Sequence, residues 1–335
     1  MEKLYIPEGY KSPQNMRETQ TAIKDLKDYF ERALSDTLNL TRVSAPIFVT
    51  SESGINDNLN GFEKPVKFFI PNQNKQVEVV HSLAKWKRLA LYRYGFEKGE
   101  GLYANMTAIR RDEEVDNIHS VYVDQWDWEK IIDKSERNID TLKKYVFRIY
   151  MALKQTEYYI CGKYHFIEPI LPNEIYYVTT QELEDRWPNK TSKEREYLIT
   201  KEKKAVFLMQ IGGALNSGKP HDDRAPDYDD WELNGDILLY YPLLDISLEI
   251  SSMGIRVDNN SLLNQLEIAG CEERVNLPYH QAITDQILPH TIGGGIGQSR
   301  LYMFFLRRAH IGEVQSSVWP LEVYKNLNNH NINII

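Results

Sequence analysis

An arginine and a pair of polar residues could line a binding cleft in the first half of the chain. The run Arg110-Arg-Asp-Glu113 precedes a strand-like segment, 118–128, in which Gln125 and Asp127 share one face. An arginine at the end of one strand can face the same cleft as polar side chains on the next, and its guanidinium suits a phosphate. A salt-bridged hairpin would give the same pattern, so the spacing leaves both interpretations open.

Two carboxylates later in the chain could hold a metal ion. Asp236 and Glu249 lie in segments with strand character, and Ser251 or Ser252 follows closely. Carboxylate oxygens suit magnesium beside a nucleotide. In a regular strand Ser251 would share the face of Glu249. On spacing alone, an ordinary exposed strand face explains these residues better than a metal site does.

A glycine cluster could let the backbone approach a ligand closely. The sequence Gly293-Gly-Gly-Ile-Gly-Gln-Ser-Arg300 has few side chains that would block such an approach. Arg300 could then make paired contacts to a phosphate. Its charge opposes the positive end of the dipole where a helix is expected to start, and this misfit favours a binding role over a flexible turn.

The acidic run between Asp222 and Asp230 also contains Arg224 and Tyr228. A solvated acidic loop is the usual meaning of such a run. The mixed charges would also suit a site that binds an anion together with an ammonium group, and the sequence leaves both interpretations about equally open. The run lacks the glycine and the terminal glutamate of a calcium-binding loop.

A phosphate-binding loop is suggested by Gly213-Ala-Leu-Asn-Ser-Gly218-Lys219, but the match is incomplete. Pro220 stands where a serine or threonine hydroxyl should reach magnesium. The residues that follow show no helical pattern, so no helix N-terminus would face the phosphate. We expect a surface turn here.

The elements that position these residues can be predicted from hydrophobic periodicity. A helix that starts at Ser12-Pro13 carries Ile23, Leu26, Phe30 and Leu34, and a second long helix carries Leu142, Val146, Ile149 and Leu153. Shorter helices are expected over 83–92 and from about 298 to 308, and strands over 41–50, 77–80, 118–128, 205–211, 236–241 and 247–253. Pro46 inside the first strand indicates an edge or interface position. The pattern predicts one α+β domain over residues 1–335, an antiparallel β-sheet core flanked by helices.

Composition limits the class of protein. The 335 residues carry a formal net charge of −8, and such a surface is a poor match for nucleic acid. No apolar run approaches the roughly 18 residues of a membrane span, and the polar start does not resemble a signal peptide. Two distant cysteines, Cys161 and Cys271, support neither a disulfide framework nor a cysteine zinc site. We therefore expect a cytoplasmic protein with no membrane or nucleic-acid partner.

Six segments, in order, resemble the bacterial ammonia-dependent aspartate–ammonia ligases, the asparagine synthetase A family. The likeness runs from about Tyr5 to Trp319, and the segments are 81–88, 119–128, 224–231, 233–237, 251–256 and 291–300. Glu232 alone joins the third and fourth segments, a shorter connection than some members of the family carry. Six matches in the same order make this resemblance highly specific.

The resemblance implies the fold of a class II aminoacyl-tRNA synthetase catalytic core, close to the aspartyl and asparaginyl enzymes. The helix before Pro46 and its strand resemble the first class II motif, which implies a homodimer. Residues 110–113 with the next strand resemble the second motif, and residues 293–300 resemble the third. Synthetases usually carry an acidic residue before the arginine of the third motif, where this chain has Ser299, and that difference matches the ammonia-dependent family.

The implied reaction uses ATP and Mg²⁺. The side-chain carboxylate of aspartate attacks the α-phosphorus of ATP to give β-aspartyl-AMP and diphosphate, and ammonia then forms asparagine and releases AMP. By motif match, Arg110 contacts the α-phosphate, Arg300 contacts the γ-phosphate, and Gly295 and Gly297 line the ATP site. Asp236 and Glu249 would hold magnesium. Residues expected to bind aspartate and ammonia are Ser82, Lys87, Gln125, Asp127, Asp229, Ser252 and Arg256, with Asp57 as the base that deprotonates ammonium.

Three other functions fit the sequence less well. An aspartyl-tRNA synthetase would need an anticodon-binding barrel, for which we expect no room, and a less acidic surface. A regulatory module that kept the fold and lost the site should lack competent residues, whereas every matched position carries one. A glutamine-dependent synthetase would have a cysteine after Met1, and residue 2 is Glu2.

Overall fold

An eight-stranded β-sheet lies at the centre of the computed structural model, which describes residues 4–57 and 63–335. In spatial order the strands are β1 (Leu40–Arg42), β5 (Gly101–Ile109), β6 (Tyr122–Ile131), β11 (Thr291–Gly297), β10 (Ile246–Arg256), β9 (Asp229–Tyr241), β8 (Ala205–Met209) and β7 (Tyr176–Thr179). The strands from β5 to β8 run antiparallel, as predicted. The edge strands β1 and β7 pair in parallel, so the sheet as a whole is mixed.

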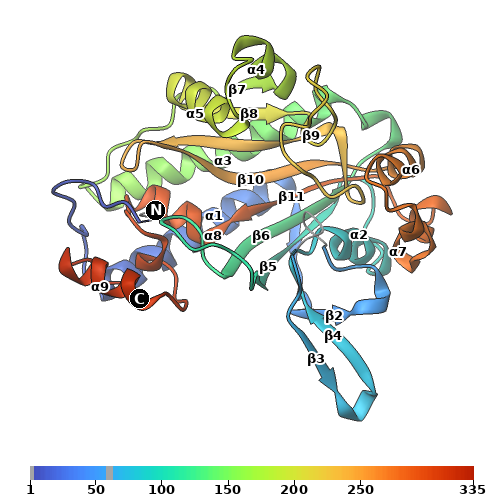
Figure 1. Cartoon of the computed structure of the whole chain (residues 1–335), viewed down its shortest axis with the longest axis horizontal. Helices are drawn as coiled ribbons and strands as arrows, with labels where there is room; N and C mark the ends of the chain where they lie inside the picture. The colour runs from blue at the N-terminus through green and yellow to red at the C-terminus, as the bar shows by residue number, and fades with distance from the viewer. Residues whose placement is uncertain (1–3, 58–62) are drawn as a thin grey trace.

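A small second sheet projects from the body (Figure 1). It has the order β2 (Phe48–Thr50), β4 (Lys75–Val79) and β3 (Lys67–Ile70). The single strand predicted over 41–50 is therefore wrong, because β1 ends at Arg42 and β2 starts in the other sheet. Pro46 lies in the gap between them and has no N–H to donate to a ladder.

Two long helices, α1 (Met16–Leu38) and α3 (Ile139–Lys163), pack on each other and bury the predicted apolar stripes. Leu26, Phe30 and Leu34 are fully buried, as are the four stripe residues of α3. The predicted start of the first helix at Ser12 is wrong, because Asn15 and Glu18 form the capping box. Ser12 instead donates a hydrogen bond to Glu313 at 2.6 Å.

The other helices surround the sheet. They are α2 (Ala84–Arg93), α4 (Thr180–Arg186), α5 (Ser192–Lys203), α6 (Asn259–Ile268), α7 (Pro278–Thr284), α8 (Gln298–Phe305) and α9 (Leu321–Asn329). The helix predicted up to residue 308 ends at Phe305, and α9 was not predicted. Within the described ranges, no helix has the length and apolar character needed to cross a membrane.

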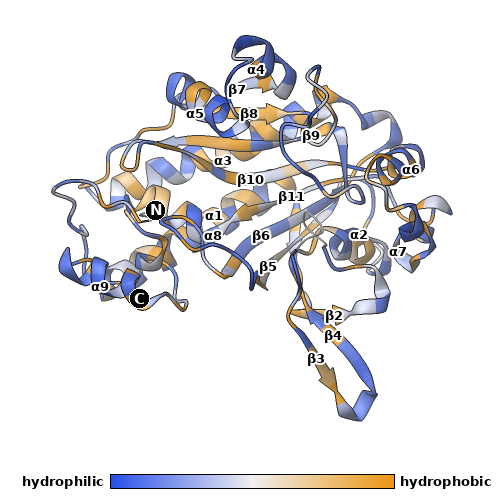
Figure 2. Ribbon diagram, viewed as in Figure 1, coloured by the Kyte–Doolittle hydropathy of each residue, from blue (hydrophilic) through white to orange (hydrophobic). Residues whose placement is uncertain are grey.

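Strand β6 separates the hydrophobic core from a polar face. Trp126 and Trp128 are fully buried, and Trp126 lies 4.8 Å from the ring of Phe30 on α1. Gln125 and Asp127 alternate with them and face the opposite side, as the period of two predicts. Figure 2 shows apolar residues along the central sheet and also along the projecting strand β3. The free polar face of the sheet is where a ligand site can form.

Candidate active site

A pocket of about 460 Å³ opens over the polar face of β6, β10 and β11. Thirteen of the fourteen residues expected at the site line this pocket, and Asp236 does not. The others all line the pocket: Asp57, Ser82, Lys87, Arg110, Gln125, Asp127, Asp229, Glu249, Ser252, Arg256, Gly295, Gly297 and Arg300. The fold thus brings together residues that lie up to about 240 positions apart in the sequence.

One end of the pocket holds a buried ion pair between Lys87 of α2 and Asp127 of β6. The Lys87 ammonium donates to Asp127 Oδ1 and, at 2.9 Å, to the carbonyl oxygen of Gly294. Burial lowers the pKa of Lys87, while the charge of Asp127 opposes that shift. Asp127 Oδ2 is buried and accepts no hydrogen bond from the residues that the structure describes.

Arg256 of β10 lies beside this pair and is held by two carboxylates. Its Nε and Nη2 donate to Glu129 at 3.0 and 2.7 Å, and its Nη1 donates to Asp229. Thr291 also donates to Glu129, at 2.6 Å. Burial favours a higher pKa for Glu129, but the charge of Arg256 brings that pKa below its usual value. Burial raises the pKa of Asp229, against the charge of Arg256.

Sequence reasoning missed Glu129, although a signal for it exists. Glu129 follows Asp127 by two residues, so a strand places both side chains on the same face. The carboxylate is fully buried. A buried, unmatched acid on that face needs a cationic partner, and Arg256 supplies it.

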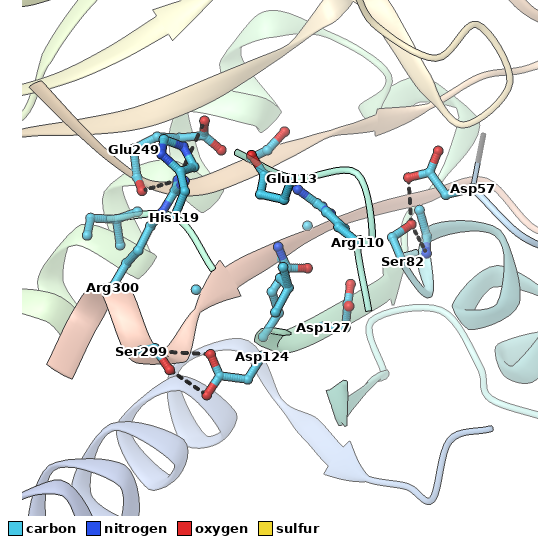
Figure 3. Close-up of a pocket in the computed structure, with 18 of the residues that line it drawn as sticks. Asp57, Ser82, Arg110, Glu113, His119, Asp124, Asp127, Glu249, Ser299 and Arg300 are labelled. Carbon is cyan, nitrogen blue, oxygen red and sulfur yellow. Dashed lines mark hydrogen bonds and ion pairs between the residues drawn. The ribbon is translucent and has the colours of Figure 1, made fainter. Parts of the chain in front are cut away.

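Asp57 contacts Ser82 at the same end of the pocket. Ser82 Oγ donates to Asp57 Oδ2 at 2.8 Å, and the imidazole Nδ1 of His81 lies 3.1 Å from the Asp57 carbonyl oxygen. Both contacts come from the segment that leads into α2. The Asp57 carboxylate is therefore held in a defined orientation toward the cavity (Figure 3).

Two arginines line the pocket on the side of Glu249 and act on its carboxylate. Arg110 follows directly after β5, and Arg300 lies in the first turn of α8. The guanidinium of Arg300 donates to the carbonyl oxygen of Glu249 at 3.1 Å, and lies 3.9 Å from its carboxylate. Figure 3 shows Arg300 extending toward Glu249 and His119. Two guanidinium groups at one end of a pocket form a site for a phosphate chain.

His119 is a second pocket residue that was not assigned a role from the sequence. Its ring Nδ1 lies 2.8 Å from Asp116, which fixes the ring orientation and leaves Nε2 directed away from that contact. It belongs to the 119–128 segment that carried the resemblance, which is the signal that could have identified it.

Asp236 lies beside the pocket but is paired with an arginine. It is opposite Ser252 in the β9–β10 ladder, and its Oδ2 accepts from Arg224. Asp236 Oδ1 is buried and accepts no hydrogen bond from the described part of the chain. Burial raises the pKa of Asp236 to about 7, against the lowering effect of Arg224. Among the described residues, no group of three or more His, Cys, Asp or Glu side chains could by itself hold a metal.

A β-bulge decides which serine of β10 reaches the pocket. Glu249 pairs with Leu238 and Ser251 pairs with Ile237, so Ile250 is an extra residue in the ladder. The insertion turns Ser252 toward the pocket beside Glu249 and buries Ser251. The prediction that Ser251 shares the face of Glu249, which assumed a regular strand, is therefore wrong.

The glycine cluster forms strand β11 rather than a flexible turn. A Cβ at Gly293 would lie 2.0 Å from Glu129 Oε2, and one at Gly295 would lie 2.5 Å from Gln125 Oε1. The glycines are needed because the polar side chains of β6 pack across β11, which is the close approach that the sequence suggested.

Only part of the acidic run enters the site. The residues of the run that line the pocket are Asp222, Asp223, Arg224, Ala225, Tyr228 and Asp229. Asp227 is instead buried against Lys85 at 2.8 Å and His280 at 3.0 Å. The segment before it, which resembled a phosphate-binding loop, is a turn closed by a bridge between Ala214 and Pro220, as expected.

Comparison with known proteins agrees with this geometry. A sequence model described as aspartate–ammonia ligase matches residues 17–331. A relative named aspartate–ammonia ligase from Clostridium perfringens is 62% identical over 338 residues, covering all of both chains. Another of the same name, from Clostridium tetani, is 61% identical over 97% of this chain and 95% of its own.

Solved structures of similar fold are class II aminoacyl-tRNA synthetases. Asparaginyl-tRNA synthetase from Pyrococcus horikoshii, complexed with asparaginyl-adenylate, superposes with a TM-score of 0.66 at 17% identity, covering 90% of this chain and 70% of that one. Aspartyl-tRNA synthetase from Entamoeba histolytica gives a TM-score of 0.59 at 15% identity, over 89% of this chain and 58% of that one. The α+β class II fold expected from the sequence is confirmed, and at full-length identities of this size the chain belongs to the aspartate–ammonia ligase family.

Proposed function

We propose that this protein makes L-asparagine, AMP and diphosphate from L-aspartate, ammonia and ATP through a β-aspartyl-AMP intermediate. The observation that carries the proposal is the two-ended pocket. Arg110 and Arg300 both lie near enough to Glu249 to act on its charge, and Lys87, Asp127 and Arg256 form a buried charged cluster elsewhere in the lining. A phosphate chain and a small zwitterion can thus be held in one cavity, as adenylation of a carboxylate requires.

Aspartate would bind at the Lys87 end. The cations of Lys87 and Arg256, with the amide of Gln125, suit its two carboxylates. Asp127 Oδ2, which accepts no hydrogen bond from the described residues, suits its ammonium group. Ser252 also lines the pocket and can add a hydroxyl contact. The side-chain carboxylate of aspartate would then face the two arginines.

ATP would bind at the arginine end, with its α-phosphate at Arg110 and its γ-phosphate at Arg300. Gly295 and Gly297 also line the pocket and would let the nucleotide approach the sheet. Arg110 would stabilise the negative charge that builds on the α-phosphate as the carboxylate oxygen attacks. A fixed guanidinium is effective there because it is already oriented before the reaction.

Magnesium fits the two carboxylates near the arginine end. Asp236 Oδ1 accepts no hydrogen bond from the residues described, and Glu249 lines the pocket. Mg²⁺ commonly takes one or two carboxylates and completes its shell with phosphate oxygens and water. The ion would neutralise the departing diphosphate. Glu249→Gln should raise the Mg²⁺ concentration needed for half-maximal activity, whereas Glu202→Gln on the exposed surface should not change it.

The second step needs neutral ammonia. Asp57 is our candidate for the group that takes a proton from ammonium, because Ser82 holds its carboxylate at the aspartate end of the pocket. Asp229, which also lines this end, would bind the ammonium or position the ammonia. Attack on the acyl carbon then releases AMP.

The whole chain, residues 1–335, is proposed to act as one catalytic domain in a cytoplasmic homodimer. The projecting sheet supports self-association, because Ile47, Phe48, Phe68 and Phe69 expose large apolar side chains there. Such a patch favours a protein partner. Sedimentation of the native protein and of a Phe68→Ser, Phe69→Ser variant tests this, and a native monomer would contradict it.

The test of the function compares nitrogen donors. We expect asparagine and AMP from ATP, Mg²⁺ and aspartate with ammonium, and none with glutamine or without a donor. Equal use of glutamine would contradict the ammonia-dependent reaction. Transfer of aspartate to tRNA would instead support the synthetase alternative.

A further inference from the structure

We propose that Asp124 is a positioning residue for Arg300 and acts through Ser299 in the first turn of helix α8. The inference rests on the proposed function, since it concerns the arginine assigned to the ATP phosphates. It deepens that function by naming a residue that fixes this arginine from a neighbouring strand.

The carboxylate of Asp124 accepts two hydrogen bonds from Ser299. The backbone N–H of Ser299 donates to Oδ1 at 3.0 Å, and its hydroxyl donates to Oδ2 at 2.8 Å. Figure 3 shows both contacts among the residues that line the pocket, while Arg300 extends from the same turn toward Glu249. Asp124 is thus bonded to the residue directly before the arginine.

Gln315 fixes which group donates in the hydrogen bond between the Ser299 hydroxyl and Asp124. Its side-chain amide Nε2 donates to Ser299 Oγ at 2.9 Å. A serine hydroxyl has one hydrogen, and here it points to Asp124, so the oxygen can only accept from Gln315. The result is a directed chain from Gln315 through Ser299 to Asp124. Gln315 is buried, which strengthens the need for this partner.

Helix α8 depends on this carboxylate because it has no cap of its own. Its N-cap residue is Gly297, which makes no side-chain capping hydrogen bond. The first backbone N–H groups of a helix need acceptors from outside it. Gln125 is the β6 residue paired with Gly297 at the end of the β11 ladder, and Asp124 comes directly before Gln125 on β6. The carboxylate therefore caps α8 from the adjacent strand, where the ladder stops.

The charge of Asp124 also compensates for the position of Arg300. An arginine in the first turn opposes the positive end of the helix dipole, whereas a carboxylate there stabilises it. Arg300 can then extend over the pocket, where it donates to the Glu249 carbonyl oxygen. Without the cap, the first turn of α8 and the guanidinium it carries would be less well placed for a phosphate.

The first test measures ATP and aspartate separately in Asp124→Ala. We expect the Kd for ATP, measured by calorimetry, and the KM for ATP to rise about fivefold to tenfold, the size expected for a lost cap. The KM for aspartate should stay within about twofold, because Asp124 does not act on that end. Asp124→Asn keeps one acceptor for the Ser299 N–H and should give an intermediate rise. Equal effects on both substrates would overturn the proposal.

The second test asks whether Asp124 acts through Arg300. In an Arg300→Ala background, Asp124→Ala should cause no further rise in the Kd for ATP, because the residue it positions is gone. A rise of the same factor in both backgrounds would overturn the proposal. It would mean that Asp124 affects the nucleotide site independently of Arg300.

Asp133→Ala is the matched control. Asp133 accepts from the N–H and the hydroxyl of Ser135 at 3.2 and 3.0 Å, the same pair of bonds outside the pocket. The Asp133→Ala variant should bind ATP with the same Kd as the native protein. Ser299→Ala removes only the hydroxyl and provides a milder variant if Asp124→Ala does not fold.

ATP binding distinguishes a failure of the positioning role from a failure of the proposed function. Native protein that binds ATP, together with Ser299→Ala and Asp124→Asn variants that bind it equally well, would overturn the positioning role alone. Native protein that does not bind ATP would overturn the proposed function and this inference with it.

Discussion

Lys87 and Asp127 form an ion pair inside the pocket that engages only one carboxylate oxygen of Asp127. The other oxygen, Oδ2, accepts no hydrogen bond from the chain as far as it is described. Both side chains are almost fully buried. A buried acceptor of this kind is costly unless a ligand completes it. This is why we assign Oδ2 to the ammonium group of aspartate.

Asp127→Asn should therefore weaken aspartate binding. We expect the KM for aspartate to rise about 10- to 100-fold, the range for losing a hydrogen bond between charged groups. The KM for ATP should change far less, since the arginine end keeps its residues. Steady-state kinetics with each substrate varied in turn checks this, and a change confined to ATP would contradict the assignment.

Arg110→Ala should abolish adenylate formation. The guanidinium is placed to stabilise charge on the α-phosphate, and loss of one such group typically costs about 10²- to 10³-fold in rate. Aspartate-dependent exchange of labelled diphosphate into ATP measures this step alone. Arg111→Ala is the matched control, because Arg111 pairs with Asp112 at 3.4 Å and does not line the pocket. Normal exchange by Arg110→Ala would remove Arg110 from the site.

Gly295→Ala should impair aspartate binding more than folding. The new Cβ would lie 2.5 Å from Gln125 Oε1, which is the end of a side chain that can move aside. Gln125 would then leave its place in the pocket, and the KM for aspartate should rise about tenfold, the cost of one displaced polar contact. Gly213→Ala is the control, since no atom lies within 4 Å of its Cβ position. Unchanged kinetics in Gly295→Ala would show that Gln125 is not needed.

Asp227→Asn should destabilise the fold, because it breaks a buried ion pair. Lys85 and His280 would lose their partner, at a cost of about 3–5 kcal/mol in the free energy of unfolding. Glu202→Gln, in an exposed pair with Arg186, should change the free energy of unfolding far less, because solvent screens such a pair. Denaturant unfolding of both variants at pH 7 checks this. Equal stability of Asp227→Asn and the native protein would contradict it.

The stability difference between the native protein and Asp227→Asn should also depend on pH. Burial opposes ionisation of Asp227, but the charges of Lys85 and His280 hold its pKa below the ordinary value of 3.8. A carboxylate with a depressed pKa contributes its full stability above the pKa of the unfolded state. The advantage of the native protein over Asp227→Asn should thus be constant above about pH 4 and shrink below it. An advantage that grows as pH falls would contradict this.

Much of the fold could be predicted from the alternation of residues in strands and from helical spacing. Trp126 and Gln125 could be assigned to opposite faces of β6 because a strand repeats every two residues. The same rule failed at β10, since a bulge at Ile250 is set by the ladder with β9 and leaves no local signal. Helix α9 was missed because no side chain caps its start and Leu327 is the one residue it buries, so it has little local signal.

The candidate site could be assembled from the sequence only through the family resemblance. No local pattern distinguishes Asp227, which is buried against Lys85, from Asp229, which lines the pocket. The pairing of Asp236 with Arg224 depends on how the loop before β9 folds back on the sheet. The capping of α8 by Asp124 joins a residue of β6 to a residue of α8 that lies 175 positions later in the sequence. Such contacts are set by tertiary structure.

The most direct test of the β-aspartyl-AMP intermediate follows one oxygen atom from aspartate to the nucleotide product. Aspartate labelled with ¹⁸O in its side-chain carboxylate is incubated with ATP, Mg²⁺ and ammonium, and the nucleotide products are analysed by mass. If the carboxylate attacks the α-phosphorus, asparagine must form together with AMP that carries one ¹⁸O, and the diphosphate must be unlabelled. ADP with labelled inorganic phosphate, or unlabelled AMP, would contradict the β-aspartyl-AMP intermediate.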